Sequence, residues 1–190
     1  MDDDRAGPDV RPPAEVDEAL GRMRYTSFLV AGLFTGETTA MPWDDLYALA
    51  VPGRSFCMFF NPANALRVDG PRRPGGSLVV YSVAERAAAL MQHSDEEVRD
   101  RYLADLYEVF PQARGIVREV IIQRWPLAVA LAFPGRTALQ RLLAEAWGWG
   151  RIVLAGDYTL TLEGVDASET GRQAAEAVVH RLSESRKETS

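Results

Sequence analysis

Hydrophobic and polar positions along the chain change between two spacings, one typical of β-strands and one typical of α-helices. Apolar runs of strand length at 25–34, 46–51, 55–60, 77–83 and 115–125 predict five strands. Apolar positions three and four residues apart predict helices at 14–23, 84–91, 94–109, 136–147 and 166–182. The nearly all-apolar run at 151–155 is typical of a parallel strand that is covered on both faces. The pattern therefore predicts an α+β (α/β) fold with a mixed or antiparallel sheet.

Turn and cap residues set the expected boundaries of these elements. Pro52-Gly53 predicts a hairpin turn between the second and third strands, and the prolines and glycines of segment 61–76 predict a loop. Ser94 and Glu97 form a capping-box pattern that opens a helix. Because proline has no backbone N–H, we expect Pro126 to end the strand that precedes it.

Four segments are expected along the chain. Residues 1–13 carry aspartate and proline with almost no apolar side chains and are expected to be a disordered tail. Residues 14–135 hold most of the predicted strands and form one expected domain, and residues 136–185 form a second, smaller one. Residues 186–190 are expected to be a short tail.

Composition narrows the classes of function. The 190 residues carry 21 basic and 27 acidic side chains, and a net charge of -6 argues against nucleic acid as a partner. No apolar run reaches the length of a membrane span, and the acidic N-terminus is unlike a secretory signal, so we expect a soluble, cytoplasmic protein. Cys57 is the only cysteine, and His93 and His180 lie far apart in sequence, so no metal site is expected.

The last 65 or so residues carry the informative motifs in a fixed order. Arg124-Trp125-Pro126 is followed by Pro134-Gly135-Arg136 and then by the apolar run that ends in Gly156-Asp157. The final helix has small residues at Ala167, Thr170, Gly171, Ala174 and Ala175. This order resembles the C-terminal end of the flavin amine oxidase superfamily, which includes protoporphyrinogen oxidases, monoamine oxidases and phytoene desaturases. The match has one departure, because Glu163-Gly164 lies two residues further upstream than the family pattern places its Glu-Gly pair.

The resemblance implies a site for FAD at these motifs. Gly156 lets a ligand approach the backbone, and the Asp157 carboxylate suits the hydroxyls of a ribityl chain. Backbone N–H groups at the start of the last helix would stabilise the flavin edge that gains negative charge on reduction. The residues that supply them are Gly164, Val165, Asp166 and Ala167. Trp125 resembles the aromatic residue that the family places before its flavin-side turn. No residue stands out as a general base, so the catalytic residues stay unassigned.

A flavoenzyme of this family also needs a G-x-G-x-x-G turn between a strand and a helix to hold the FAD pyrophosphate, and this sequence contains none. The resemblance therefore implies a C-terminal-half subunit of a split FAD-dependent oxidase, desaturase or dehydrogenase. In such a subunit, residues 14–135 would be a substrate-domain half, and residues 136–185 would be the C-terminal part of an FAD-binding domain, with its last strand and helix. Its partner would be a separate chain that carries G-x-G-x-x-G, and its substrate a small hydrophobic organic molecule. Two alternatives stay open: a non-catalytic interaction protein derived from this fold, and an unrelated α+β domain that binds a small ligand.

Overall fold

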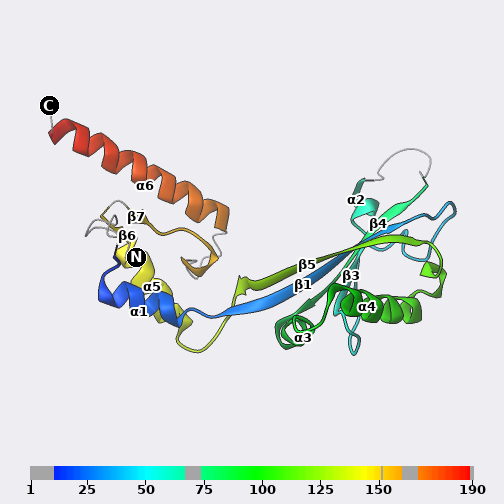
Figure 1. Cartoon of the computed structure of the whole chain (residues 1–190). Helices are drawn as coiled ribbons and strands as arrows, with labels where there is room; N and C mark the ends of the chain where they lie inside the picture. The colour runs from blue at the N-terminus through cyan, green and yellow to red at the C-terminus, as the bar shows by residue number, and fades with distance from the viewer. Residues whose placement is uncertain (1–10, 67–73, 151, 160–166, 189–190) are drawn as a thin grey trace, which may run out of the picture. The chain divides into compact units, whose positions relative to one another are not determined.

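A computed structural model describes residues 11–66, 74–150, 152–159 and 167–188 of the chain (Figure 1). Its contacts divide the chain into two compact units. Unit 1 combines Met1–Tyr25 with Ala130–Ser190, and unit 2 is Thr26–Val129. This division differs from the expected boundary at residue 135, because the helix of residues 14–22 packs with elements from the C-terminal part of the chain.

Unit 2 is built on an antiparallel sheet of five strands in the order β2-β3-β4-β1-β5 (Figure 1). The strands are β1 (Tyr25–Thr35), β2 (Ala48–Ala50), β3 (Met58–Phe60), β4 (Gly76–Val83) and β5 (Val117–Ala130). The helices are α2 (Pro62–Leu66), α3 (Ala84–Leu90) and α4 (Asp95–Val109), followed by the short 3-10 turn η2 (Pro111–Ala113). The structure thus confirms an α+β fold.

Alternation along β1 and β4 gives this sheet one buried face and one open face. Leu29 lies across from Ser82 and Ala31 across from Val80, and all four side chains are buried. Their sequence neighbours point to the other face and are only partly covered. Because side chains alternate with a period of two, a shift of one residue in register would exchange the two faces.

Helix α4 covers the buried face and is fixed to it by a buried tyrosine. Tyr102 is fully buried, and its hydroxyl lies 2.6 Å from the Ser82 hydroxyl and donates to the Leu29 carbonyl at 3.3 Å. The capping box that the sequence predicts is present, with Ser94 Oγ accepting from the Glu97 N–H and the Glu97 carboxylate accepting from the Ser94 N–H. The hydrogen bond from the Ser94 N–H to the carboxylate is the main cause that lowers the pKa of Glu97 below its usual value.

Arg124 connects β5 to the turn between α3 and α4. Its guanidinium pairs with Asp95 at 2.6 Å and donates to the backbone carbonyl of His93 at 2.9 Å. It also donates to the carbonyl of Leu90 at the end of α3. The first residue of the Arg124-Trp125-Pro126 motif therefore has a structural role.

Unit 1 has a smaller core, in which α1 (Ala14–Arg22) packs on α5 (Arg136–Ala146). Val16, Ala19, Leu139 and Leu143 form most of this core, and Leu154 completes it. A hairpin of β6 (Gly148–Trp149) and β7 (Ile152–Val153) follows α5, and the 3-10 turn η3 (Asp157–Thr159) follows β7. The last helix, α6 (Ala167–Glu188), contacts β7 and η3.

The expected parallel strand at 151–155 is wrong for the residues that the structure describes there. Ile152 and Val153 pair antiparallel with Gly148 and Trp149. The apolar run indicated burial correctly for Leu154, but burial alone does not choose a pairing partner. Gly148, with φ of +141°, belongs to this hairpin as well as ending α5.

Two further expectations need correction. The segment that follows β3 begins with the short helix α2 and not with a loop. Pro126 lies inside β5 and does not end it. The physical reason is that β5 is an edge strand, where proline's missing N–H costs no hydrogen bond of the sheet.

Among the residues that the structure describes, no helix has the length and hydropathy to cross a bilayer.

We expect Tyr102→Phe to lower the free energy of unfolding by about 1 kcal/mol, the usual contribution of one buried hydrogen bond. The cost stays at that level because the Ser82 hydroxyl keeps the Ser55 carbonyl as a second partner. Urea denaturation of wild type and variant measures it. The matched control is Tyr107→Phe, at a half-buried tyrosine of the same helix, and an equal loss in the control would contradict the role of the Tyr102 hydroxyl.

Candidate functional site

The Gly156-Asp157 turn of unit 1 joins segments that lie far apart in sequence. Asp157 accepts a hydrogen bond at Oδ1 from the Tyr25 hydroxyl at 3.2 Å and one at Oδ2 from the Ala130 N–H at 3.0 Å. Gly156 has a φ of +138°, and a Cβ there would lie 2.7 Å from the Tyr158 ring. Glycine is therefore required at this position by the backbone and by the adjacent tyrosine.

Arg136, the first residue of α5, lies beside the same turn. It donates from Nη1 to the Ala130 carbonyl at 3.1 Å and from Nη2 to the Asp157 carbonyl at 3.2 Å. Its Nε atom is buried and has no hydrogen-bond partner among the residues that the structure describes. An unpaired buried N–H is costly, so this donor marks a place where a ligand acceptor would be stabilised.

The start of α6 is held against the turn by Thr170. Its hydroxyl accepts from the Gly156 N–H at 3.0 Å and donates to the Ala167 carbonyl at 2.9 Å. Ala167 is the first residue of α6 and is exposed. Gly164, Val165 and Asp166, which the sequence also assigns to the flavin, lie outside the described residues, and these assignments stay predictions.

Tyr25 is the group of this turn with the largest shift in pKa. Burial raises its pKa to about 12, and the adjacent Asp157 carboxylate contributes because it disfavours a second negative charge. The neutral tyrosine is thus the form that the folded protein stabilises. That contribution is fully present below the ordinary pKa of about 10 and is lost as the pH rises towards 12.

Unit 2 presents a row of aromatic side chains on the open face of its sheet. The ring of Phe28 lies 4.6 Å from that of Tyr81, measured between centroids. Phe60 stacks on Tyr81 at 5.6 Å and an angle of 21°. Tyr47 meets the edge of Phe60 at 5.6 Å and is 60% exposed. The row runs from the start of β2 across β3 and β4 to β1 and offers an apolar surface for a ligand.

Other apolar side chains of unit 2 extend this uncovered surface. Phe34 of β1 and Ile121 of β5 are both large and exposed. Trp125 is 52% exposed and is followed on alternate positions of β5 by the exposed Leu127 and Val129. Large apolar side chains gathered on one surface are typical of a binding site.

Sequence reasoning missed the aromatic row and the roles of Tyr25 and Arg136. Strand-length patterns located β1, β3 and β4, but only the register shows that Val30 and Met58 both lie across from Tyr81. The contact of Tyr25 with Asp157 spans 132 residues of sequence, and no local pattern predicts it. The structure brings together Gly156, Asp157 and the start of α6, while Trp125 lies in unit 2.

The sequence matches the family model described as flavin containing amine oxidoreductase over residues 7–179, which is most of the chain. The chain belongs to this family. A search of curated proteins found no match. By its description, this is a family of flavin-containing oxidoreductases. The resemblance inferred from the C-terminal motifs is thereby confirmed.

Solved structures show the same fold over part of their length. A protein described as a protoporphyrinogen oxidase of Exiguobacterium sp. 255-15 matches with a TM-score of 0.66 and 14% identity, over 86% of this chain and 37% of that one. A reduced UDP-galactopyranose mutase matches with a TM-score of 0.58 and 15% identity, over 87% of this chain and 35% of that one. This family member therefore spans little more than a third of the length of either relative.

The described residues fit the sugar-alcohol part of an FAD molecule but not its phosphates. Each carboxylate oxygen of Asp157 accepts one hydrogen bond in the structure and has a second lone pair for a hydroxyl. The buried Nε–H of Arg136 supplies a donor at the same turn. No G-x-G-x-x-G turn occurs in the sequence of 190 residues, so the phosphates have no dedicated loop in this chain.

Replacing Asp157 with asparagine should lower the pKa of Tyr25 from about 12, because the carboxylate charge beside the hydroxyl is removed while burial is kept. Absorbance titration of tyrosinate, with Tyr25→Phe used to identify the signal, measures the change. Tyr102, whose pKa burial also raises to about 12, is the internal control and should not move. An unchanged Tyr25 titration would show that the carboxylate does not act on this hydroxyl.

Proposed function

We propose that this chain is the smaller subunit of an FAD-dependent oxidase, desaturase or dehydrogenase, and that a separate chain supplies the dinucleotide-binding half. The observation that carries the proposal is that the family model covers most of this chain, whereas the chain covers only about a third of its solved relatives. The family model covers residues 7–179, yet the chain matches only 37% and 35% of two solved relatives. The sequence also has no G-x-G-x-x-G turn, which FAD binding in this family requires. FAD would then be shared between the two chains.

Within this proposal the open face of the unit 2 sheet binds the substrate. The row of Tyr47, Phe60, Tyr81 and Phe28 is apolar and has flat ring faces. Such a surface favours a hydrophobic, planar or conjugated organic molecule, because burial of apolar area and ring stacking both contribute.

The turn of unit 1 holds and orients the cofactor in this proposal. Bound FAD would supply the redox chemistry by accepting a hydride from a carbon next to nitrogen or at an allylic position. Asp157 would accept hydrogen bonds from the ribityl hydroxyls. Tyr25 and the Ala130 N–H keep the carboxylate in place through the bonds that they donate. Backbone N–H groups at the start of α6 would lie beside the flavin ring, where they stabilise developing negative charge.

Co-expression tests the two-chain arrangement. The chain alone should bind no stoichiometric FAD, because it has no pyrophosphate loop. Co-expression with the product of a neighbouring reading frame that carries a G-x-G-x-x-G half should give a yellow complex, detected by gel filtration with flavin absorbance. In that complex Asp157→Ala should weaken FAD retention by about 1–3 kcal/mol, the range for removing a charged hydrogen-bond partner.

A stoichiometric flavin spectrum in the isolated chain contradicts the proposal. A stable complex that holds no flavin and oxidises no substrate would instead support the non-catalytic interaction protein. Unchanged FAD retention in Asp157→Ala would assign the carboxylate a purely structural role at its turn.

The outward face of α6 provides a second test of the partner. Gly171 has open space where a Cβ would be, and Val179 and Leu182 are exposed. Gly171→Leu should leave the isolated chain folded but weaken the complex by about 1–3 kcal/mol through overpacking at the interface. Gly21→Leu in α1, which also has open space, is the matched control. An intact, fully yellow complex with Gly171→Leu would exclude this face of α6 from the interface.

A further inference from the structure

The two edges of the unit 2 sheet differ in length and in how they are protected. β2 forms one edge and has only three residues, which leaves few unpaired backbone groups. β5 forms the other edge and has 14 residues. No strand within the described ranges pairs with its outer side. Long unpaired edges are templates for the addition of another strand.

The usable part of this edge is bounded. Pro126 has no N–H to donate, and the Ala130 N–H is already bonded to Asp157. The outward-facing backbone groups that stay available therefore lie between Val117 and Trp125. This stretch of β5 is long enough to pair with a strand of ordinary length, which is about five to six residues.

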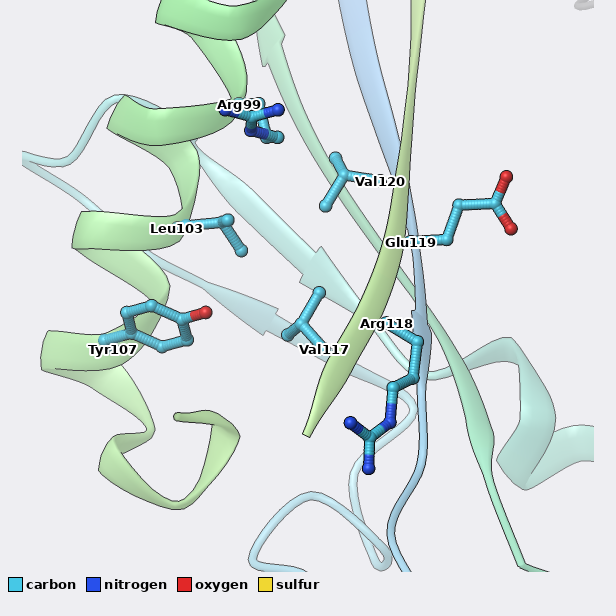
Figure 2. Close-up of a pocket in the computed structure, with 7 residues that line it drawn as sticks. All are labelled: Arg99, Leu103, Tyr107, Val117, Arg118, Glu119 and Val120. Atoms are coloured by element: carbon cyan, nitrogen blue, oxygen red, sulfur yellow. The ribbon is translucent and has the colours of Figure 1, made fainter. Parts of the chain in front are cut away.

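A recess opens at this same edge, between α4 and β5 (Figure 2). Its volume is about 220 Å³, and it is lined by Arg99, Leu103 and Tyr107 of α4 and by residues 117–120 of β5. Figure 2 shows Val117 and Val120 pointing toward the helix, while Glu119 points away from it. The core between α4 and the sheet is thus open to solvent on the β5 side. An apolar side chain from an added strand would fill the recess.

An arginine beside this recess favours a partner strand that carries a carboxylate. Arg118 is exposed and makes no ion pair within the described part of the chain, whereas Arg99 is paired with Glu96 and Asp100. A carboxylate on the added strand near Arg118 would therefore be stabilised. Farther along the strand, Ile121 and Trp125 expose apolar surface that a partner docked on β5 would also cover.

We propose that a strand of the flavin-binding partner adds to the outer edge of β5, inserts an apolar side chain into the recess beside α4 and places a carboxylate near Arg118. This assignment rests on the proposed function. The partner is the chosen occupant because this chain covers only 37% and 35% of the two solved relatives, and under the proposed function the partner supplies the remainder.

Hydrogen exchange on the co-expressed complex tests strand addition directly. Amides of residues 117–125 that face outward should exchange about tenfold or more slowly in the complex than in the isolated chain, because they gain hydrogen-bond partners. The three-residue edge strand β2 is the internal reference and should not change. Faster or equal exchange along β5 in a stable complex overturns the inference.

Two variants test the side-chain contacts. Arg118→Glu should weaken the complex about tenfold by replacing an attractive charge with a repulsive one. Its matched control is Arg101→Glu, at an exposed arginine of α4 that does not line the recess. Val120→Phe fills the recess with the chain's own side chain and should also weaken the complex. Urea denaturation of the isolated variant checks that it is folded.

The outcomes separate the two proposals. If wild type forms the flavin complex and both variants match it in affinity, the edge assignment is overturned and the proposed function stands. If wild type forms no such complex, the proposed function fails and this inference fails with it. If the isolated chain dimerises and Arg118→Glu abolishes the dimer, a second copy of this chain is the occupant and the partner assignment is overturned.

Discussion

The burial of one face of the five-stranded sheet under α4 is the constraint on which the rest of unit 2 depends. Tyr102 connects the helix to two different strands through its contacts with Ser82 of β4 and the Leu29 carbonyl of β1. Once the face of Leu29 and Val80 is buried, the alternate side chains must point outward. The aromatic row is therefore a direct consequence of where the helix lies.

Unit 1 depends on a different kind of contact, in which polar groups carry much of the organisation. Its apolar core is small, and the Gly156-Asp157 turn is held by hydrogen bonds from Tyr25, Ala130 and Thr170. This arrangement lets α6 begin at a defined place, beside β7 and η3. Val179 and Leu182 of α6 are exposed and would lose this contact with water if a partner covered the helix.

Three surfaces of the chain are thus incomplete in a similar way: the open sheet face, the outer edge of β5 and the outward face of α6. Membership of the flavin-containing amine oxidoreductases, together with the short match to solved relatives, supports one account of all three. A substrate would cover the first surface and a flavin-binding partner the other two. Under the proposed function, the buried Nε–H of Arg136, which is unpaired among the described residues, would supply a donor to the cofactor beside Asp157.

Much of the local structure was determined by the sequence itself. Alternation and helical spacing predicted β1, β4, α4 and α5 closely, and Ser94 with Glu97 predicted the cap of α4, because these signals act between residues a few positions apart. The ordered motifs near the C-terminus predicted the family. Their assignment to flavin contacts remains a prediction for Gly156, Asp157, Ala167 and Trp125.

Tertiary structure decided what depends on partners distant in sequence. It placed Tyr25 and the Ala130 N–H on Asp157, aligned four aromatic rings through the strand register and paired β7 with β6 and not with a parallel neighbour. It also allowed Pro126 inside β5, because only the strand order shows that this strand is an edge. Side-chain periodicity in the sequence indicates which residues are buried. Which residues contact one another follows from how the whole chain packs.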